Sequence, residues 1–186
     1  MIETIDQTKR IFCGIGLSAL ACGLSTPALA AWPKMASPTA RHLSFHNLHT
    51  DERLQIAYWK DGAYDRTAWA QINHILRDHY SGQSHVMDLR LMDLLHDLQM
   101  SLRNDNTIEI ISGYRAPITN QHLREATNGV AKNSFHLQGK AIDIRINGTA
   151  LSDIHTAALA MDRGGVGYYP DSQFVHVDVG PVRRWG

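Results

Sequence analysis

The sequence predicts an α+β fold. In several segments apolar residues recur at the spacing of a helix, and in several others they alternate with polar residues as in a half-buried strand. The helical segments come before and between the strands, as in a sheet with segregated helices. The chain has 186 residues, of which 44% are hydrophobic and 19% charged, so it is long enough for one well-packed domain.

The first half of the domain is expected to contain a hairpin followed by two helices. Residues 41–47 and 54–59 alternate on either side of a polar turn, which predicts two antiparallel strands. A helix is predicted over residues 67–80, where the apolar positions form a helical stripe. A second helix is predicted over residues 86–102, where leucines give a broad apolar face.

The second half is expected to combine short helices with further strands. Strands are predicted over residues 107–111, 141–145, 166–169 and 174–179, and helices over residues 120–126 and 150–161. Gly164 and Gly165 predict a turn into the strand that begins at Val166.

The first thirty residues have the pattern of a cleaved export signal. Lys9 and Arg10 precede an apolar run, and Ala28 and Ala30 end it with the small-residue pattern that signal peptidase accepts. The run is about 14 residues long, too short to span about 30 Å of hydrocarbon. We therefore expect residues 1–30 to be removed, and residues 31–186 to form an exported domain without stable membrane insertion. Lys9 stands where a twin-arginine signal has its first arginine, so the export route stays open.

Both cysteines, Cys13 and Cys22, lie inside this leader. The domain after it has no thiol, which excludes disulfides, a cysteine nucleophile and cysteine-bound metal. Lipid attachment at Cys22 is the alternative to cleavage near Ala31. The whole chain has 18 basic and 18 acidic residues, and this balance predicts no general attraction to nucleic acid or to anionic membranes.

A possible metal site is formed by His136, Asp143 and His176. His136 lies in a turn-forming stretch before a predicted strand, and Asp143 lies between apolar neighbours of that strand. A half-buried carboxylate is costly alone, and a metal ion neutralises it. His176 interrupts a second apolar strand in the same way. Two imidazoles and one carboxylate are the ligand set of a catalytic zinc, although a hydrogen-bonded core histidine and a salt-bridged aspartate would give the same pattern.

The segment SGYRAP, residues 112–117, follows a predicted strand and offers a loop arginine, Arg115. A guanidinium can bind a carboxylate through two parallel hydrogen bonds. We therefore consider Arg115 a candidate substrate-binding residue, with a surface ion pair as the alternative.

Four strings, SGYRAP, NSFHLQGKAIDI, GGVGYYP and FVHVDVG, resemble the zinc peptidases of bacterial cell walls, the D-alanyl-D-alanine metallopeptidase group. Within this group, the chain more closely resembles the murein endopeptidase K branch. The similarity continues through HNLHTDERL, YWKDGAYD and INHILRDHYSG, so it covers nearly the whole exported domain. Zinc modules of the hedgehog signalling type share the metal frame and cut nothing, so the frame alone does not establish catalysis.

This resemblance implies an antiparallel sheet flanked by helices, with one zinc ion held by His136, Asp143 and His176. It also implies peptide substrates from the stem peptides of peptidoglycan and a location in the periplasm or cell envelope. Arg115, Tyr114 and Ser134 would bind the substrate. The HExxH motif of helix-based zinc proteases is absent from the sequence.

The general base is the one departure from the family pattern. Many relatives have an acidic residue three positions before the last histidine, where this chain has Gln173. Asp178, two residues after His176, would lie on the same strand face and could act as the base or orient the metal ligand. Asp171 is the alternative base. Asp178 could also simply pair with an arginine such as Arg115, Arg183 or Arg184.

The expected reaction is amide hydrolysis, in which zinc lowers the pKa of its water toward about 7 and polarises the scissile carbonyl. An endopeptidase that cuts peptidoglycan cross-links is favoured by the resemblance. A carboxypeptidase that removes a terminal D-alanine would use the same residues. A zinc-dependent module that binds peptidoglycan without cutting it is the third possibility, and Gln173 is the reason to consider it.

Overall fold

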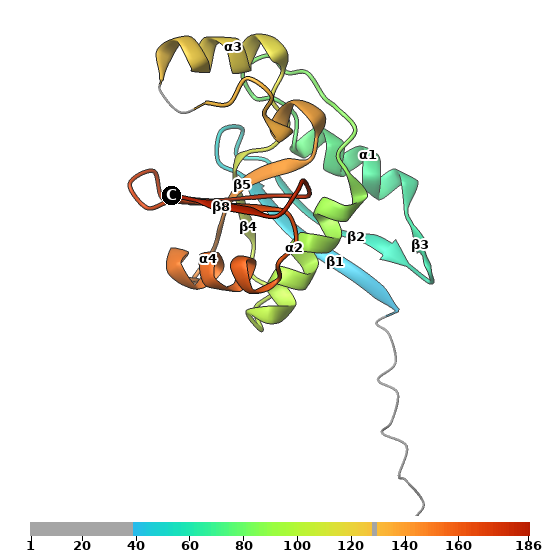
Figure 1. Ribbon diagram of the computed structural model, residues 1–186. Coiled ribbons are helices and arrows are strands. Elements are labelled where there is room, and N and C mark those ends of the chain that lie inside the picture. The colour runs from blue at the N-terminus through green and yellow to red at the C-terminus, as the bar shows by residue number, and fades with distance from the viewer. Residues whose placement is uncertain (1–38, 128–129) are drawn as a thin grey trace, which may run out of the picture. The chain divides into compact units, whose positions relative to one another are not determined.

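One eight-stranded sheet organises the protein in the computed structural model, which describes residues 39–127 and 130–186 (Figure 1). The predicted leader lies outside the described residues. The strands are β1 (Ala40–Asn47), β2 (Arg53–Lys60), β3 (Ala63–Tyr64), β4 (Ile108–Ser112), β5 (Ala141–Ile146), β6 (Gly165–Tyr169), β7 (Phe174–Asp178) and β8 (Arg183–Trp185). Their order in the sheet is β3-β2-β1-β4-β5-β7-β6-β8. The β1–β4 and β6–β8 pairs are parallel, and the other five are antiparallel.

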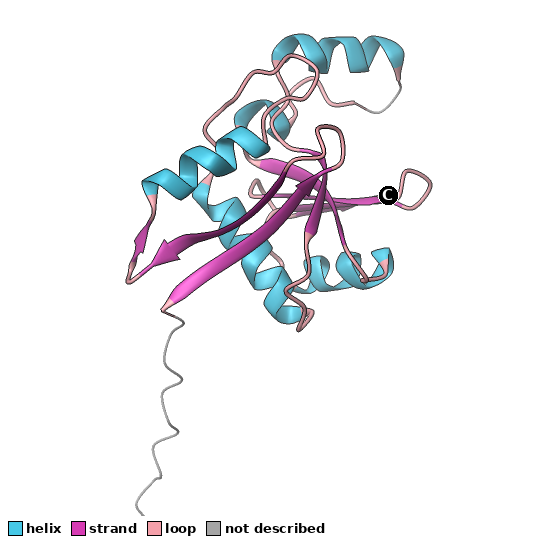
Figure 2. Cartoon of the chain, turned by 180° about the vertical axis from the view of Figure 1, so that it is seen from behind, coloured by secondary structure: helices cyan, strands magenta, loops and turns pink. Residues whose placement is uncertain are grey.

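The helices lie on both sides of this sheet. They are α1 (Arg66–Ile75), α2 (Leu89–Ser101), α3 (Pro117–Ala126) and α4 (Leu151–Ala160), with a short 3-10 helix η1 (Phe135–Gln138). Helix α1 packs on β2, and α2 and α4 contact each other and the strands. Helix α3 lies on the other side of the sheet from α4 (Figure 1 and Figure 2). Within the described ranges, no helix is long and apolar enough to cross a membrane.

The predicted α+β class is confirmed, and so is the hairpin of β1 and β2. Helix α1 ends at Ile75 instead of residue 80, because Asp78 leaves the helix and accepts hydrogen bonds from the backbone N–H groups of Tyr80 and Ala116. Helix α2 begins later than predicted, because the Asp88 side chain caps it by accepting the N–H of Arg90. Elements β3, η1 and β8 were not predicted, since each is too short to show a period.

The two faces of the β5–β7 half of the sheet differ in character. The apolar residues face the core on the side of α4, and the residues between them face the opposite side. The core-facing residues of these two strands are Ile142, Ile144, Val175 and Val177. Asp143 and His176 therefore lie together on the face away from the helical core, on strands held in place by that core.

Candidate metal centre

The site begins with a row of residues that runs across five neighbouring strands. Ser112 of β4 pairs with Asp143 of β5, and Asp143 pairs with His176 of β7. His176 pairs with Gly167 of β6, which in turn pairs with Trp185 of β8. Cross-strand partners on one face are close neighbours. The sheet register alone therefore places Asp143 next to His176, with Trp185 near the β8 end of the row.

His136 joins this row from η1 and completes a triangle of donor atoms. Its Nε2 lies 3.2 Å from His176 Nδ1 and 3.3 Å from Asp143 Oδ1. The distance between His176 Nδ1 and Asp143 Oδ1 is 2.8 Å. All three residues are buried. A tetrahedral zinc with ligands at 2.0–2.1 Å separates its ligand atoms by about 3.3 Å. The triangle is therefore close to the size that one such ion requires.

The second nitrogen of each imidazole shows which nitrogen carries the hydrogen. His136 Nδ1 lies 2.7 Å from the carbonyl oxygen of Gly113, which can only accept. His176 Nε2 lies 2.9 Å from Asp178 Oδ2, an ionised carboxylate oxygen. Both outer nitrogens therefore donate, and in the neutral rings the inner nitrogens present lone pairs to Asp143. Three lone pairs converging on one point repel one another unless a cation lies between them.

The pKa shifts of Asp143 and His176 also indicate that positive charge is favoured among the three donor atoms. Burial alone would raise the pKa of Asp143, but the imidazoles of His136 and His176 hold it well below its usual value. Burial would lower the pKa of His176, but its hydrogen bonds with Asp143 and Asp178 outweigh burial and raise it. Both shifts favour positive charge at this point of the structure. The donor set therefore fits a divalent cation.

Asp178 lies behind His176, away from the open cleft. Its side chain is fully buried, and its Oδ1 accepts the backbone N–H groups of Gly165 and Gly180 at 3.0 and 2.8 Å. Its Oδ2 accepts from His176, and both oxygens accept from Arg183. Burial would raise its pKa, but these hydrogen bonds lower the pKa to about 2. This environment suits a carboxylate that orients an imidazole, because both oxygens are already occupied.

The donor triangle opens into a cleft of about 820 Å³. Its lining residues are Arg115, Thr127, Val130, Ala131, Asn133, Ser134, Phe135, His136, Asp143, Tyr169, Ser172, Phe174, His176, Arg183 and Trp185. The described lining thus includes the three donors, two arginines and four aromatic side chains. Asp143 is the one carboxylate among them.

Of the three predicted substrate-binding residues, Arg115 and Ser134 line the cleft and Tyr114 does not. Arg115 lines the cleft, and its Nη2 lies 3.8 Å from Asp143 Oδ2. Ser134 also lines the cleft, and its hydroxyl oxygen accepts the backbone N–H of His136 at 3.3 Å. Tyr114 is outside the cleft lining, buried and stacked on His85 with ring centroids 4.8 Å apart. Asp171 is exposed in the turn between β6 and β7 and is also absent from the lining.

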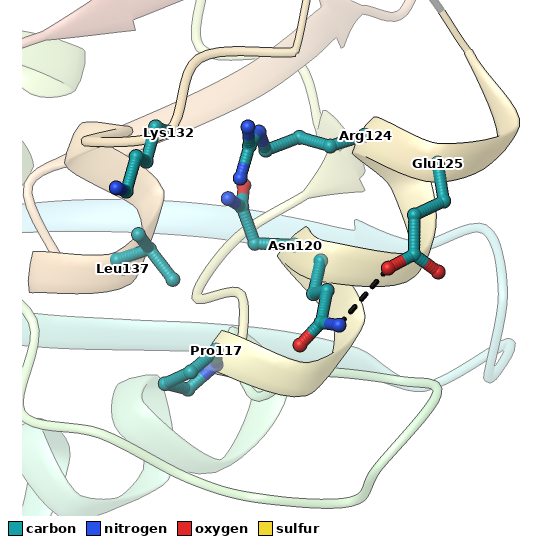
Figure 3. A pocket seen from close by; sticks show the side chains of 7 residues that line it. Pro117, Asn120, Arg124, Glu125, Lys132 and Leu137 are labelled. Atoms are coloured by element: carbon teal, nitrogen blue, oxygen red, sulfur yellow. Dashed lines mark hydrogen bonds between the residues drawn. The ribbon is translucent and has the colours of Figure 1, made fainter.

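Beside this cleft, a smaller hollow of about 400 Å³ lies next to α3. Asn120, Arg124 and Lys132 surround it in Figure 3. The buried Asn120 links this hollow to the lining of the larger cleft, because its amide oxygen accepts from Arg115 and its NH₂ group donates to the carbonyl of Ala131. Helix α3 therefore supports Arg115 through Asn120.

Comparison with known proteins agrees with this geometry. A family model described as peptidoglycan L,D-endopeptidase MepK matches residues 35–185. The chain belongs to this family. Peptidoglycan L,D-endopeptidase MepK of Escherichia coli strain K12 is 40% identical over 185 residues, covering 99% of this chain and 100% of that protein. The probable peptidoglycan L,D-endopeptidase MepK of Haemophilus influenzae is 38% identical over 182 residues, 97% of each chain. No solved structure matches the chain.

The family membership predicted from the sequence strings is thereby confirmed. Sequence reasoning missed the aromatic part of the cleft, formed by Phe135, Tyr169, Phe174 and Trp185. The alternation of side chains along a strand could have predicted two of them. Phe174 is two residues before His176, so it lies on the same face of the sheet, and it pairs with Tyr169. Trp185 had no such signal, because the three-residue strand β8 was not predicted.

Proposed function

We propose that the protein is a zinc-dependent endopeptidase that hydrolyses peptide cross-links of bacterial peptidoglycan. The observation that carries this proposal is the convergence of three electron-pair donors, 2.8–3.3 Å apart, at an open cleft. The names of the relatives indicate the bond, a peptide linkage between an L- and a D-configured residue. The leader predicted over residues 1–30 would bring the enzyme to the periplasm, where this polymer lies.

His136, Asp143 and His176 would hold one zinc ion. When bound, zinc supplies a Lewis acid that polarises the scissile carbonyl and lowers the pKa of water. Gly113 and Asp178 would hold the hydrogen of each neutral imidazole on its outer nitrogen, which is the tautomer that a metal ligand needs. We assign Asp178 this orienting role, because its buried and fully occupied oxygens leave no lone pair facing the cleft.

Arg115 would bind an anionic part of the substrate. Its side chain reaches the cleft with 13% of its surface exposed, and its neutral partners are Ser112 and Asn120 at 3.4 and 3.3 Å. Its one carboxylate neighbour, Asp143, is at the long distance of 3.8 Å. The guanidinium therefore keeps donors for a substrate carboxylate or for the negative charge that develops on the carbonyl oxygen.

The layout of the cleft favours internal cleavage over the removal of one terminal residue. Arg115 bonds to Ser112 at the β4 end of the cross-strand row, and Trp185 lies at the β8 end. Asp143 and His176 lie between them. We infer that Arg115 and Trp185 contact parts of the substrate on either side of the metal, as cleavage of an internal bond requires.

Purified peptidoglycan sacculi test the proposal directly. We expect the protein to release soluble muropeptides whose mass spectra show cleavage of an internal L,D bond, and we expect a chelator to stop the release and added zinc to restore it. Release of single D-alanine residues would identify a carboxypeptidase instead. Co-sedimentation with sacculi without any released product would identify a binding module.

Substitution of Arg115 separates substrate binding from metal binding. Arg115→Lys keeps the charge but loses the planar two-pronged geometry. We expect zinc content to stay at the wild-type level, and kcat/KM to fall about ten- to a hundredfold, equivalent to about 1.5–3 kcal/mol. Arg115→Ala should lose more. Arg53→Lys, at an exposed position on β2, is the matched control, and wild-type rates in both Arg115 variants would contradict the assignment.

A further inference from the structure

Strand β8 lies beside two glycines of β6. Arg183 pairs with Gly165, and Trp185 pairs with Gly167. Residues two apart on a strand share a face, so both side chains of β8 project on the side of the sheet that carries His176. Arg184 lies between them in the sequence, has a side chain that is 60% exposed, and forms an ion pair with the exposed Asp162.

The glycines provide the space that these two side chains occupy. A Cβ at Gly165 would lie 2.7 Å from Arg183 Nη1 and 2.5 Å from Asp178 Oδ2, and a Cβ at Gly167 would lie 2.6 Å from Trp185. Neither glycine has a positive φ, so the requirement is for space and not for an unusual backbone conformation. The side chains of Arg183 and Trp185 thus cross over β6 to reach β7.

Arg183 meets the residue that orients His176. Its Nη1 and Nη2 donate to the two oxygens of Asp178 at 3.1 and 2.5 Å, and Asp178 accepts from His176 Nε2. The guanidinium also lies 4.8 Å from the ring centre of Phe135, the residue before His136. A fully buried carboxylate is costly without a counter-charge. Arg183 therefore supplies the counter-charge for the Asp178 carboxylate behind the imidazole.

Trp185 contacts His176 directly. The centres of the two rings are 5.2 Å apart, and Trp185 Nε1 donates to the hydroxyl oxygen of Tyr169 at 2.7 Å. Arg183 packs against the same indole, with 5.0 Å between the guanidinium carbon and the ring centre. The indole is thus fixed at both its polar end and its face, and it limits the movement of the imidazole.

We infer that Arg183 and Trp185 are positioning residues for the metal ligand His176, and that Gly165 and Gly167 are required because they let these side chains reach it. This inference rests on the proposed metal site. It extends that site by one strand, so that β8 contributes to the metal centre although none of its residues touches the metal.

Zinc affinity, measured by competition with a chromogenic chelator on the full chain, tests the role of Arg183. Loss of an outer partner of a metal-bound histidine typically weakens metal binding about 10- to 100-fold. Arg183 is one contact further from the metal and lysine keeps its charge, so we expect a smaller loss, up to about tenfold, in Arg183→Lys, and no change in Arg184→Lys, its neighbour on the opposite face. Thermal unfolding of the metal-free proteins shows whether each variant is folded.

The glycine part of the inference has its own test. Gly167→Ala should weaken zinc binding by displacing the indole, and Trp185→Ala should weaken it by removing the indole. If Gly167 only makes room for Trp185, the double variant should bind zinc no more weakly than Trp185→Ala alone. Additive losses in the double variant would overturn this role of Gly167, and the measurement does not depend on whether Arg183→Lys folds.

One comparison distinguishes the failure of this inference from the failure of the metal site. Wild-type affinity in Arg183→Lys and Trp185→Ala, together with loss of zinc in His176→Ala, would show that β8 does not position the ligand. Full zinc content in His176→Ala would instead contradict the metal site itself. A loss of zinc in the β8 variants, with the metal-free fold intact, would support the inference.

Discussion

The two histidines of the donor triangle are held in different ways. His136 donates to a main-chain carbonyl, that of Gly113, in the loop after β4. His176 donates to a buried carboxylate, Asp178, which in turn receives two hydrogen bonds from Arg183. His136 is therefore oriented by a neutral backbone carbonyl, and His176 by a pair of charged side chains, Asp178 and Arg183.

This difference predicts which side of the metal centre is more sensitive to single substitutions. A backbone carbonyl is supplied by any residue, so the support of His136 depends on the position of its loop. That loop is fixed by hydrogen bonds from Tyr114 N–H to the carbonyl of Leu76 and from Ala116 N–H to Asp78. The support of His176 depends instead on the identity of two side chains. We expect single substitutions near His176 to affect the metal, and those near His136 to affect mainly the stability of the loop.

The largest expected effects are at the donors themselves, where the two histidines should behave alike. His136→Ala, His176→Ala and Asp143→Ala should each lose most of the bound zinc and all measurable hydrolysis, because three protein ligands are the minimum of a catalytic zinc site. His96→Ala and His122→Ala, at positions in α2 and α3, should keep both. Elemental analysis of the purified variants measures the zinc content. Full zinc in any of the three donor variants would remove that residue from the ligand set.

A smaller effect is expected at Asp178, and it should appear only on the His176 side. Asp178→Asn removes the negative charge that His176 and Arg183 share, so zinc affinity should fall about 10- to 100-fold while some zinc still binds. Isothermal titration with zinc gives the affinity, and Asp162→Asn, the exposed partner of Arg184, is the control. An unchanged affinity in Asp178→Asn would show that the carboxylate only neutralises Arg183.

The same contrast explains how much of the site the sequence could predict. Asp143 and His176 interrupt strands of otherwise apolar alternation, and alternation fixes which face a residue occupies. The strand register then brings them together as cross-strand partners. Tyr114 was predicted, with Arg115, as a substrate-binding residue. The structure stacks its ring on His85, outside the described cleft lining, and neighbours in an irregular loop need not share a face.

The supports of the site were harder to predict than its donors. Strand β8 has three residues, two of them arginine, and such a segment shows no period that predicts a strand. Its contacts depend on the parallel pairing with β6, which local sequence does not specify. The end of α1 was misplaced for a related reason, because Asp78 leaves the helix to bind the loop at Ala116, 38 residues away in the chain.

The smallest expected effect on zinc binding is at Asp78, which holds the loop on the His136 side. Asp78 is 2% exposed, and its two oxygens accept the backbone N–H groups of Ala116 and Tyr80 at 2.8 and 2.9 Å. In Asp78→Asn, the NH₂ group cannot accept, so one buried N–H loses its partner at a cost of about 1–3 kcal/mol. Denaturant unfolding at pH 7 should show this loss, and Asp105→Asn, at an exposed position, should not.

The pH dependence of the same variant makes the prediction sharper. Burial would raise the pKa of the Asp78 carboxyl, but hydrogen bonds from Thr119, Ala116 and Tyr80 outweigh burial and lower it. A carboxyl whose pKa is lowered by folding stabilises the protein above its unfolded pKa of about 3.9, and this contribution is lost as the pH falls through the folded pKa. The stability difference between wild type and Asp78→Asn should therefore be constant near pH 7 and shrink below about pH 4. Zinc affinity should change less than in Asp178→Asn, because the acceptor of His136 is Gly113 and not Asp78. Equal losses of zinc in the two variants would show that the two histidines depend on their supports in the same way.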